Sequence, residues 1–168
     1  MPALRQNPLR LDHPRIEEPV AQEKSSLKIK RLRPNAKLPK RATPGSTGFD
    51  VFACIDGESA ITLVGTQPKL IPTGIAIEVP TGYDVQIRPR SGLSVKGVGV
   101  TFGTIDSDYR GEILITMYLF NPNATFEIKH GDRIAQMVVS KVADLPLVEV
   151  EELSPTERGS GGHGSTGK

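Results

Sequence analysis

Cysteine is nearly absent from this 168-residue sequence, in which Cys54 is the only one. A single cysteine excludes a disulfide within the chain, and without a cluster of histidine and cysteine residues it also excludes a thiolate zinc site. The N-terminal region lacks the apolar run of a secretory signal, and acidic residues such as Asp12 and Glu17 are atypical of organelle transit peptides. We therefore expect an intracellular protein of the cytoplasm that is not bound to a membrane.

Helical periodicity is also absent, since no stretch sustains a 3.6-residue apolar repeat over three turns. Short apolar or alternating runs separated by glycine, proline and aspartate predict strands instead. Residues 134–139 are compatible with a short helix as well as a strand. The pattern indicates an all-β fold, a sandwich or barrel of the jelly-roll type. The predicted strands cover residues 27–30, 49–52, 70–79 (an edge or bulged ribbon around Pro72 and Gly74), 83–88, 113–120, 126–129, 134–142 and 147–150.

Charge is unevenly distributed along the chain. Residues 1–41 contain eleven Lys and Arg against four acidic residues, a net charge of +7, whereas residues 42–168 have a net charge of −5. Residues 1–25 contain four prolines and no apolar periodicity, so we interpret them as a mobile basic extension of a single domain. Basic arms can bind nucleic acid, but no aromatic residue for base stacking is interleaved here. Residues 28–41 run into a predicted strand, so we expect a solvated basic face there and no stable nucleic-acid complex.

The C-terminal sequence RGSGGHGSTGK, residues 158–168, combines five glycines with three hydroxyl residues and Arg158. Glycine lets backbone N–H groups approach phosphate oxygens, and an arginine fork matches their geometry. A flexible tail is the ordinary meaning of such a composition. The P-loop pattern is met only in part, because no Ser or Thr follows Lys168 and no buried strand precedes, so we expect no P-loop.

Four polar segments interrupt the strand pattern. In the first, residues 43–53, a turn followed by a strand explains the glycines but not Asp50, an acidic residue within an apolar run. The second, residues 88–97, sets Arg88 and Arg90 beside Ser91-Gly92, a donor-rich turn suited to phosphate.

In the third segment, residues 103–111, we expect Asp106 and Asp108 on the same side of an extended stretch, next to Tyr109. The fourth, residues 131–136, opens with a Gly-Asp turn and carries Arg133 and Gln136 into an apolar stretch. Any one of these segments is compatible with turn chemistry alone. Four of them together with the tail, all rich in anion donors or carboxylates, are hard to explain as turns.

The order and wording of these segments resemble the motifs of the trimeric dUTPases. PRSG, GTIDSDYRG, GDRIAQ and RG-x-GG-x-GSTG occur here in the family's order, and the resemblance covers residues 27–168. It implies a distorted jelly roll, a homotrimer with active sites shared among chains, and hydrolysis of dUTP to dUMP and pyrophosphate, which limits uracil in DNA and supplies dUMP for dTMP synthesis. It also divides the chain into the extension, a β domain at residues 26–152 and a lid arm at residues 153–168.

The resemblance further implies roles for single residues. Asp106 would activate water for attack on the α-phosphorus, with Asp108 structural, and Tyr109 would exclude a 2′-hydroxyl. Mg²⁺ would be held mainly by the substrate phosphates and, through waters, by Asp50 and Gln136. The lid would close over the site before chemistry. The substrate-binding residues implied are Arg90, Ser91, Gly92, Thr101, Gly103, Thr104, Ile105, Tyr109, Leu114, Gln136, Arg158, His163, Gly164, Ser165 and Thr166.

The sequence departs from the family pattern at two places. His163 stands where the family usually has Phe, so the ring expected to cover uracil is titratable. Thr101 and Phe102 stand where many members have an Asn in the hairpin that reads uracil. Two other classes of protein are disfavoured by the sequence. A dCTP deaminase would need a glutamate base in the third segment, where this chain has aspartates. A non-enzymatic binding protein would have lost motif residues, and none is lost here.

Overall fold

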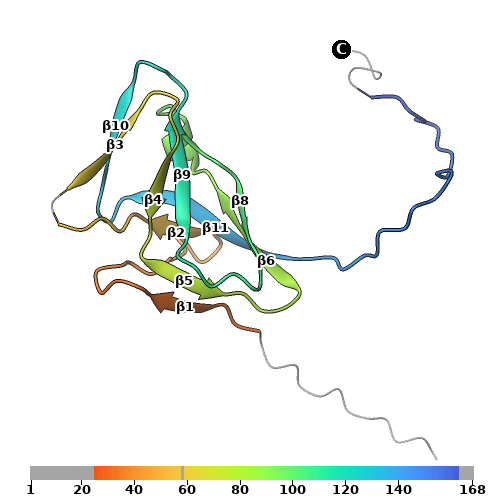
Figure 1. Cartoon of the computed structure of the whole chain (residues 1–168), viewed down its shortest axis with the longest axis horizontal. Coiled ribbons are helices and arrows are strands. Elements are labelled where there is room, and N and C mark those ends of the chain that lie inside the picture. The colour runs from red at the N-terminus through yellow and green to blue at the C-terminus, as the bar shows by residue number, and fades with distance from the viewer. Residues whose placement is uncertain (1–24, 58, 163–168) are drawn as a thin grey trace, which may run out of the picture.

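Eleven strands and one helical turn form the regular structure of residues 25–57 and 59–162, the part of the chain that this computed structural model describes (Figure 1). The strands are short, as glycine and proline punctuation dictates. They are β1 (Lys28–Arg31), β2 (Phe49–Phe52), β3 (Ala60–Val64), β4 (Lys69–Pro72), β5 (Ile75–Glu78), β6 (Tyr83–Arg88), β7 (Val98–Val100), β8 (Gly103–Ile105), β9 (Leu114–Leu119), β10 (Thr125–Lys129) and β11 (Arg133–Lys141), with helix α1 (Ser91–Ser94) between β6 and β7.

All strand pairings among these residues are antiparallel, and they form four small sheets. The largest has the order β2-β11-β6-β8, and a second has the order β4-β9-β7. Two strand pairs, β1-β5 and β3-β10, complete the fold and lie at its bottom and at its upper left in Figure 1. The predicted all-β class is confirmed. Among the described residues, no helix has the length and apolarity needed to cross a bilayer.

The strands enclose one core, to which β6 and β9 contribute alternate residues and β5 and β7 contribute consecutive ones. In β9, Ile115, Met117 and Leu119 are buried, while the residues between them are more exposed. Strand β6 repeats the pattern with Val85 and Ile87. Because side chains of a strand point alternately to the two faces, this pattern leaves the opposite face for polar residues. Most of the polar segments noted in the sequence lie at strand ends, whereas Asp50 is buried within β2.

Most of the predicted strands are confirmed, and several details differ. Residues 134–139 belong to strand β11 and not to a helix. The ribbon predicted over residues 70–79 is divided into β4 and β5 by a turn at Gly74, whose φ is +67°. The strand predicted at residues 147–150 is wrong, because this segment pairs with no strand of the described chain. Strands β3, β7 and β8 and helix α1 were not predicted.

The turn between β4 and β5 is packed directly against Cys54. A Cβ atom at Gly74 would lie 2.7 Å from Cys54 Sγ and 2.8 Å from the Cβ of Ala36. Burial raises the pKa of the Cys54 thiol, which has no disulfide partner. Beside it, the buried Thr73 hydroxyl donates to the carbonyl of Ile113 at 2.6 Å. The turn thus needs glycine twice, for its left-handed backbone and for the space it leaves.

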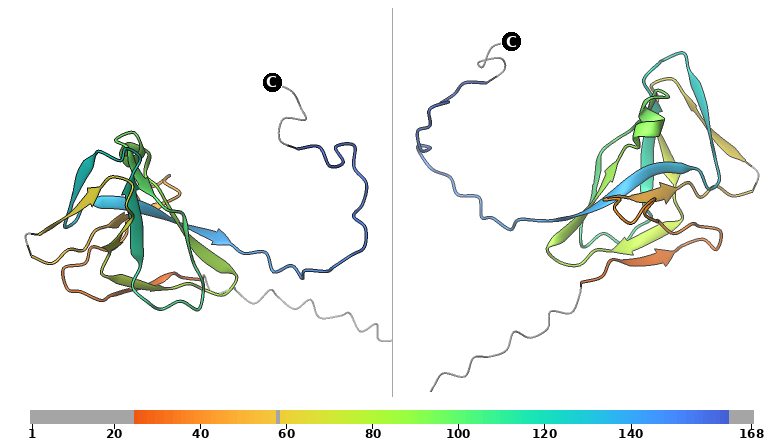
Figure 2. Two further views of the ribbon diagram at one scale, coloured as in Figure 1. Left: turned by 45° about the horizontal axis from the view of Figure 1, so that its top comes forward. Right: turned by 180° about the vertical axis from the view of Figure 1, so that it is seen from behind.

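Beyond β11 the chain leaves the body of the fold, as both views in Figure 2 show. The backbone N–H of Val142 still donates to the carbonyl of Gly82 at 3.0 Å. The residues that follow are exposed and include a series of large apolar side chains, namely Leu145, Leu147, Val148, Val150 and Leu153. Residues 1–24, the greater part of the predicted extension, lie outside the described residues.

Gly74→Ala tests how the turn between β4 and β5 packs against Cys54. Gly82 offers a matched control, because its φ of +82° is equally left-handed but a Cβ there meets nothing within 4 Å. We expect Gly82→Ala to lower the free energy of unfolding by about 1 kcal/mol through backbone strain alone, and Gly74→Ala to cost about 1–3 kcal/mol more through overlap with Cys54. Urea denaturation measures both. Equal losses would show that the turn moves to accept the methyl group.

Candidate active site

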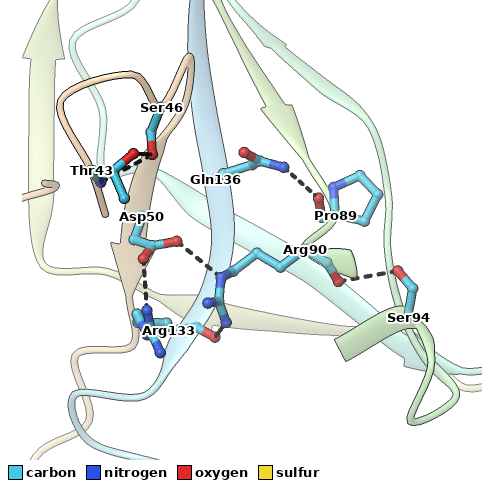
Figure 3. Close-up of polar contacts among 8 residues, drawn as sticks. All are labelled: Thr43, Ser46, Asp50, Pro89, Arg90, Ser94, Arg133 and Gln136. Atoms are coloured by element: carbon cyan, nitrogen blue, oxygen red, sulfur yellow. Dashed lines mark hydrogen bonds and ion pairs between the residues drawn. The ribbon is translucent and has the colours of Figure 1, made fainter. Parts of the chain in front are cut away.

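Asp50 is the acidic residue that the sequence places within an apolar strand. It lies in the middle of β2 and is 9% exposed, and its two carboxylate oxygens accept hydrogen bonds from two arginines (Figure 3). Arg90 Nε lies 2.9 Å from Oδ1, and Arg133 NH1 lies 3.2 Å from Oδ2. Arg90 also donates from NH1 to the carbonyl of Arg133 at 3.0 Å. A buried carboxylate requires such partners, because an unpaired charge there would be strongly unfavourable.

The three residues come from distant parts of the sequence. Asp50 is on β2, Arg133 begins β11, and Arg90 lies between the end of β6 and helix α1. Strand pairing brings Gln136 directly opposite Asp50, so their side chains share one face of the sheet. From there Gln136 Nε2 donates to the carbonyl of Pro89 at 2.9 Å, which ties β11 to the residue preceding Arg90 (Figure 3).

Helix α1 adds backbone donors to this cluster. It begins at Ser91, and Gly92 follows; both residues are exposed. The N–H groups of the first helical residues have no acceptor within the helix. The first in-helix bonds run from Leu93 and Ser94 to the carbonyl of Arg90, at 3.0 Å each. The predicted substrate-binding residues Arg90, Ser91, Gly92 and Gln136 are therefore brought together, and with Arg133 they can bind an anion.

Asp106 lies in a turn and not in the predicted extended segment. The N–H of Tyr109 donates to the carbonyl of Asp106 at 3.2 Å, and Arg110 braces the turn by donating from NH1 to the carbonyl of Ser107 at 2.7 Å. A turn removes the alternation on which the expected common side of Asp106 and Asp108 depended. Both carboxylates are exposed, and Asp106 lines a surface cavity of about 340 Å³ with Asp84, Ser107 and Asp144.

Asp106 and Arg90 are not brought together within one chain. In the β6-β8 ladder Val85 lies opposite Ile105, so Asp106 follows at the Tyr83 end of β6. Arg90 lies just past the other end, Arg88. Six residues of extended chain separate these positions, a distance of about 20 Å. Arg90 accordingly lines a different cavity, of about 260 Å³, with Lys96, Asp132 and Arg133.

The residues expected to read a base lie on β7, β8 and the two residues that connect them. Strand β7 pairs with β9, and β8 pairs with β6, so the two strands do not form a hairpin ladder with each other. The N–H of Thr101 donates to the carbonyl of Thr116 at 3.0 Å, and Phe102 is 71% exposed. The backbone of Gly103, Thr104 and Ile105 forms β8. Leu114, which begins β9, is also exposed.

The described part of the tail holds Arg158 in a turn of its own. Arg158 Nε donates to the carbonyl of Gly161 at 2.7 Å, and the N–H of Gly161 donates to the carbonyl of Arg158 at 3.1 Å. In Figures 1 and 2 this turn lies apart from the strands. The remaining residues predicted to bind from the tail, His163, Gly164, Ser165 and Thr166, lie outside the described residues.

The part of the chain that the structure describes holds no group of three or more His, Cys, Asp or Glu side chains able to bind a metal ion. Any Mg²⁺ near Asp50 would therefore need ligands from a substrate. Asp50 and Gln136 fit the expected water-mediated role, since each oxygen of Asp50 accepts one arginine hydrogen bond and keeps a second lone pair, and Gln136 keeps its side-chain oxygen. Sequence reasoning missed Arg133 as a partner of Asp50, although a strand acid calls for a counter-charge.

The chain is similar to known proteins over most of its length. A family model described as dUTPase matches residues 34–167. A deoxyuridine 5'-triphosphate nucleotidohydrolase of Nautilia profundicola is 50% identical over 145 residues, which cover 84% of this chain and 99% of the relative. A second enzyme of that name, from Neorickettsia sennetsu, is 49% identical over 81% of this chain and 93% of its own.

Solved structures of dUTPases are also similar to this chain. A Staphylococcus bacteriophage 80alpha dUTPase, solved with dUpNHpp, has a TM-score of 0.77 and 28% identity over 85% of this chain and 99% of its own. A variant dUTPase of phage phi11 of S. aureus has a TM-score of 0.69 and 25% identity over 76% of this chain and 98% of its own, and is described as coordinating a structural Mg(II) ion.

Asp50→Asn tests the arginine cluster without reference to catalysis. The amide keeps the size of the side chain but removes the charge that pairs with Arg90 and Arg133, so we expect the free energy of unfolding to fall by about 1–3 kcal/mol. The exposed pair of Lys28 and Glu78, at 2.6 Å, gives the control: Glu78→Gln should leave the urea midpoint nearly unchanged. An equally small effect for both would mean that Asp50 is stable without its partners.

Proposed function

The chain belongs to the dUTPase family and hydrolyses dUTP to dUMP and pyrophosphate, and we propose that it does so at sites shared among the copies of a homotrimer. In this proposal the turn after β8 of one copy supplies the base and the sugar contacts. The Asp50 cluster of another copy holds the phosphates. The observation that carries the proposal is the separation of about 20 Å between Asp106 and Arg90, which one chain alone does not bridge.

Asp106 is the general base of the proposed reaction. Its carboxylate is exposed at a turn whose backbone is fixed by the Tyr109 N–H and by Arg110, so it can meet a substrate without a large rearrangement. It accepts a proton from a water molecule, whose oxygen attacks the α-phosphorus in line with the leaving pyrophosphate. The bond from the α-phosphorus to the bridging oxygen breaks, and dUMP remains.

Tyr109 excludes the 2′-hydroxyl of a ribonucleotide by packing against the sugar. Its ring is 43% exposed and lies three residues after Asp106, on the same turn. Variants of the phage 80alpha enzyme solved with dUpNHpp include one at an aspartate and one at a tyrosine three positions further on, the same spacing. This match of spacing supports the pairing of Asp106 with Tyr109.

The phosphates bind at Arg90, Ser91, Gly92 and Gln136. Asp50 sets the direction of the Arg90 guanidinium, and Arg133 adds positive charge beside it. Preorganised donors of this kind stabilise the charge that develops on phosphate oxygens. Mg²⁺ bound to the triphosphate would neutralise part of that charge. Asp50 and Gln136 would hold the ion's waters through the lone pairs that their protein contacts leave.

Uracil is read by backbone groups of β7 and β8 around Thr101, with Leu114 beside them, and the tail closes over the bound nucleotide. Closure would require Arg158 to exchange its bond to the Gly161 carbonyl for phosphate oxygens, a charge-assisted and therefore stronger interaction. His163, Gly164, Ser165 and Thr166 would complete the lid. A cytoplasmic location is part of the proposal and is supported by the free Cys54.

The segment that follows β11 supports the trimer. Leu145, Leu147 and Val150 are exposed along an extended chain that has no strand partner among the described residues. Exposed apolar residues of this number mark contact surfaces. A second copy would cover them, and the same segment would carry each tail toward a neighbouring site.

Pyrophosphate release measured with dUTP, dCTP, dTTP and UTP tests the function. We expect turnover of dUTP alone at an appreciable rate, without ammonia release from dCTP. Asp106→Asn should lower kcat about 10²–10⁴-fold with little change in dUTP affinity, because the amide cannot accept the proton. Asp108→Asn is the matched control and should stay close to wild type. The opposite pattern would assign the base to Asp108.

Mixing two inactive variants tests the shared site. Chains with Asp106→Asn and chains truncated after Glu157 should each be nearly inactive. After subunit exchange, the mixture should regain part of the wild-type rate, because some sites then combine an intact base with an intact tail. Analytical ultracentrifugation should show a trimer throughout. Exchange without any recovery would mean that each chain supplies its own base and tail.

A further inference from the structure

The loop that carries Tyr109 is anchored at its far end by Glu112. The Tyr109 hydroxyl donates to the backbone carbonyl of Glu112 at 3.0 Å. Gly111 lies between them under the ring: a Cβ there would lie 2.5 Å from Cζ of Tyr109. The ring is therefore laid against the backbone of its own loop. Its position depends on where the Glu112 carbonyl is held.

The Glu112 side chain is held by two groups from other parts of the chain. Oε1 accepts the backbone N–H of Gly74 at 2.7 Å, and Oε2 lies 3.3 Å from NH2 of Arg33. The side chains of Arg33 and Glu112 are 31% and 23% exposed, so the pair is partly shielded from water. Such a pair is less screened than one at the surface.

Arg33 is fixed in turn. Its NH1 donates to the carbonyl of Cys54 at 2.9 Å. One guanidinium therefore joins the segment after β2 to Glu112, two residues before β9 begins. The next N–H, that of Ile113, donates to the carbonyl of Ile75 at 2.9 Å. Arg33 therefore does not belong to the solvated basic face expected for residues 28–41. It braces the Tyr109 loop against the residues that follow β2, while Glu112 itself contacts the β4–β5 turn through the Gly74 N–H.

We propose that Glu112, held by Arg33 and the Gly74 N–H, is a positioning residue that sets selectivity for deoxyribose over ribose by fixing the ring of Tyr109. This inference rests on the proposed role of Tyr109. The Glu112 side chain needs no contact with the nucleotide. It acts through the carbonyl that receives the Tyr109 hydroxyl, since a ring free to move by a fraction of an ångström leaves room for a 2′-hydroxyl.

The test measures the ratio of kcat/KM for dUTP to kcat/KM for UTP. Both substrates are assayed on the same preparation, so the ratio is independent of the fraction of folded enzyme. We expect Glu112→Ala to lower the ratio roughly three- to tenfold, as loss of one or two hydrogen bonds implies. Glu112→Gln keeps an acceptor for the Gly74 N–H and should lose less. Arg33→Met should match Glu112→Gln.

Tyr109→Phe keeps the ring and removes only the hydroxyl that reaches the Glu112 carbonyl. It should lower the ratio as much as Glu112→Ala, and the double variant should be little worse than either, because both changes break one connection. Additive losses would contradict the inference. Glu78→Ala, which removes the exposed pair with Lys28 on β1 and β5, is the control and should leave the ratio unchanged.

Tyr109→Ala separates the two levels of the proposal. If it leaves the ratio unchanged, Tyr109 does not select deoxyribose and the proposed function fails at that residue. If Tyr109→Ala lowers the ratio but Glu112→Ala and Glu112→Gln do not, the role of Tyr109 stands and the positioning role of Glu112 is wrong. Loss of selectivity in all the variants except Glu78→Ala is the expected result.

Discussion

The pairing of one shielded carboxylate with two arginines is the constraint on which the rest of the site depends. Asp50 lies within an apolar strand, where its charge is acceptable only because Arg90 and Arg133 approach it. Each arginine belongs to a different segment, so satisfying this charge also fixes β11 and the start of α1 relative to β2. The orientation of the donors proposed to bind phosphate is therefore a consequence of the folding requirement of a single acid.

The length of β6 imposes a second constraint. The strand separates the proposed phosphate-binding cluster at one end from the Asp106 turn at the other. The proposed catalytic site, which needs both, would therefore draw them from different copies. Each half is held by contacts of its own, the cluster by ion pairs and the turn by Arg110 and the Glu112 carbonyl, so the proposed assembly would join two preformed parts.

Much of the fold followed from local patterns, and the failures have physical causes. Strands 49–52 and 83–88 were predicted at their observed bounds, because alternation and flanking turn residues agree there. Strands β7 and β8 are three residues each, too short to show a period. Residues 147–150 have strand composition but no partner within the described chain, so the pattern reports a preference that one chain does not satisfy.

The candidate site shows the same division. The sequence motifs predicted Asp106, Arg90 and Gln136 as site residues, but not the contacts that hold their side chains in place. Arg33 looked like one of many surface cations, and its contact with Glu112 spans 79 residues of sequence. A contact of that separation leaves no local periodicity or spacing to read. The described structure thus adds mainly the second layer of residues, whose roles depend on tertiary geometry.

In the proposed trimer, the exposed apolar side chains after β11 would tie the amount of active enzyme to its concentration. A dissociated chain would present Leu147 and its neighbours to water, so dilution would favour a form that lacks a complete site and is prone to aggregation. Such a form is a substrate for chaperones and proteases. A cell that makes too little of this protein would therefore lose activity more steeply than in proportion to the number of chains. Quality control would remove the chains that are not assembled.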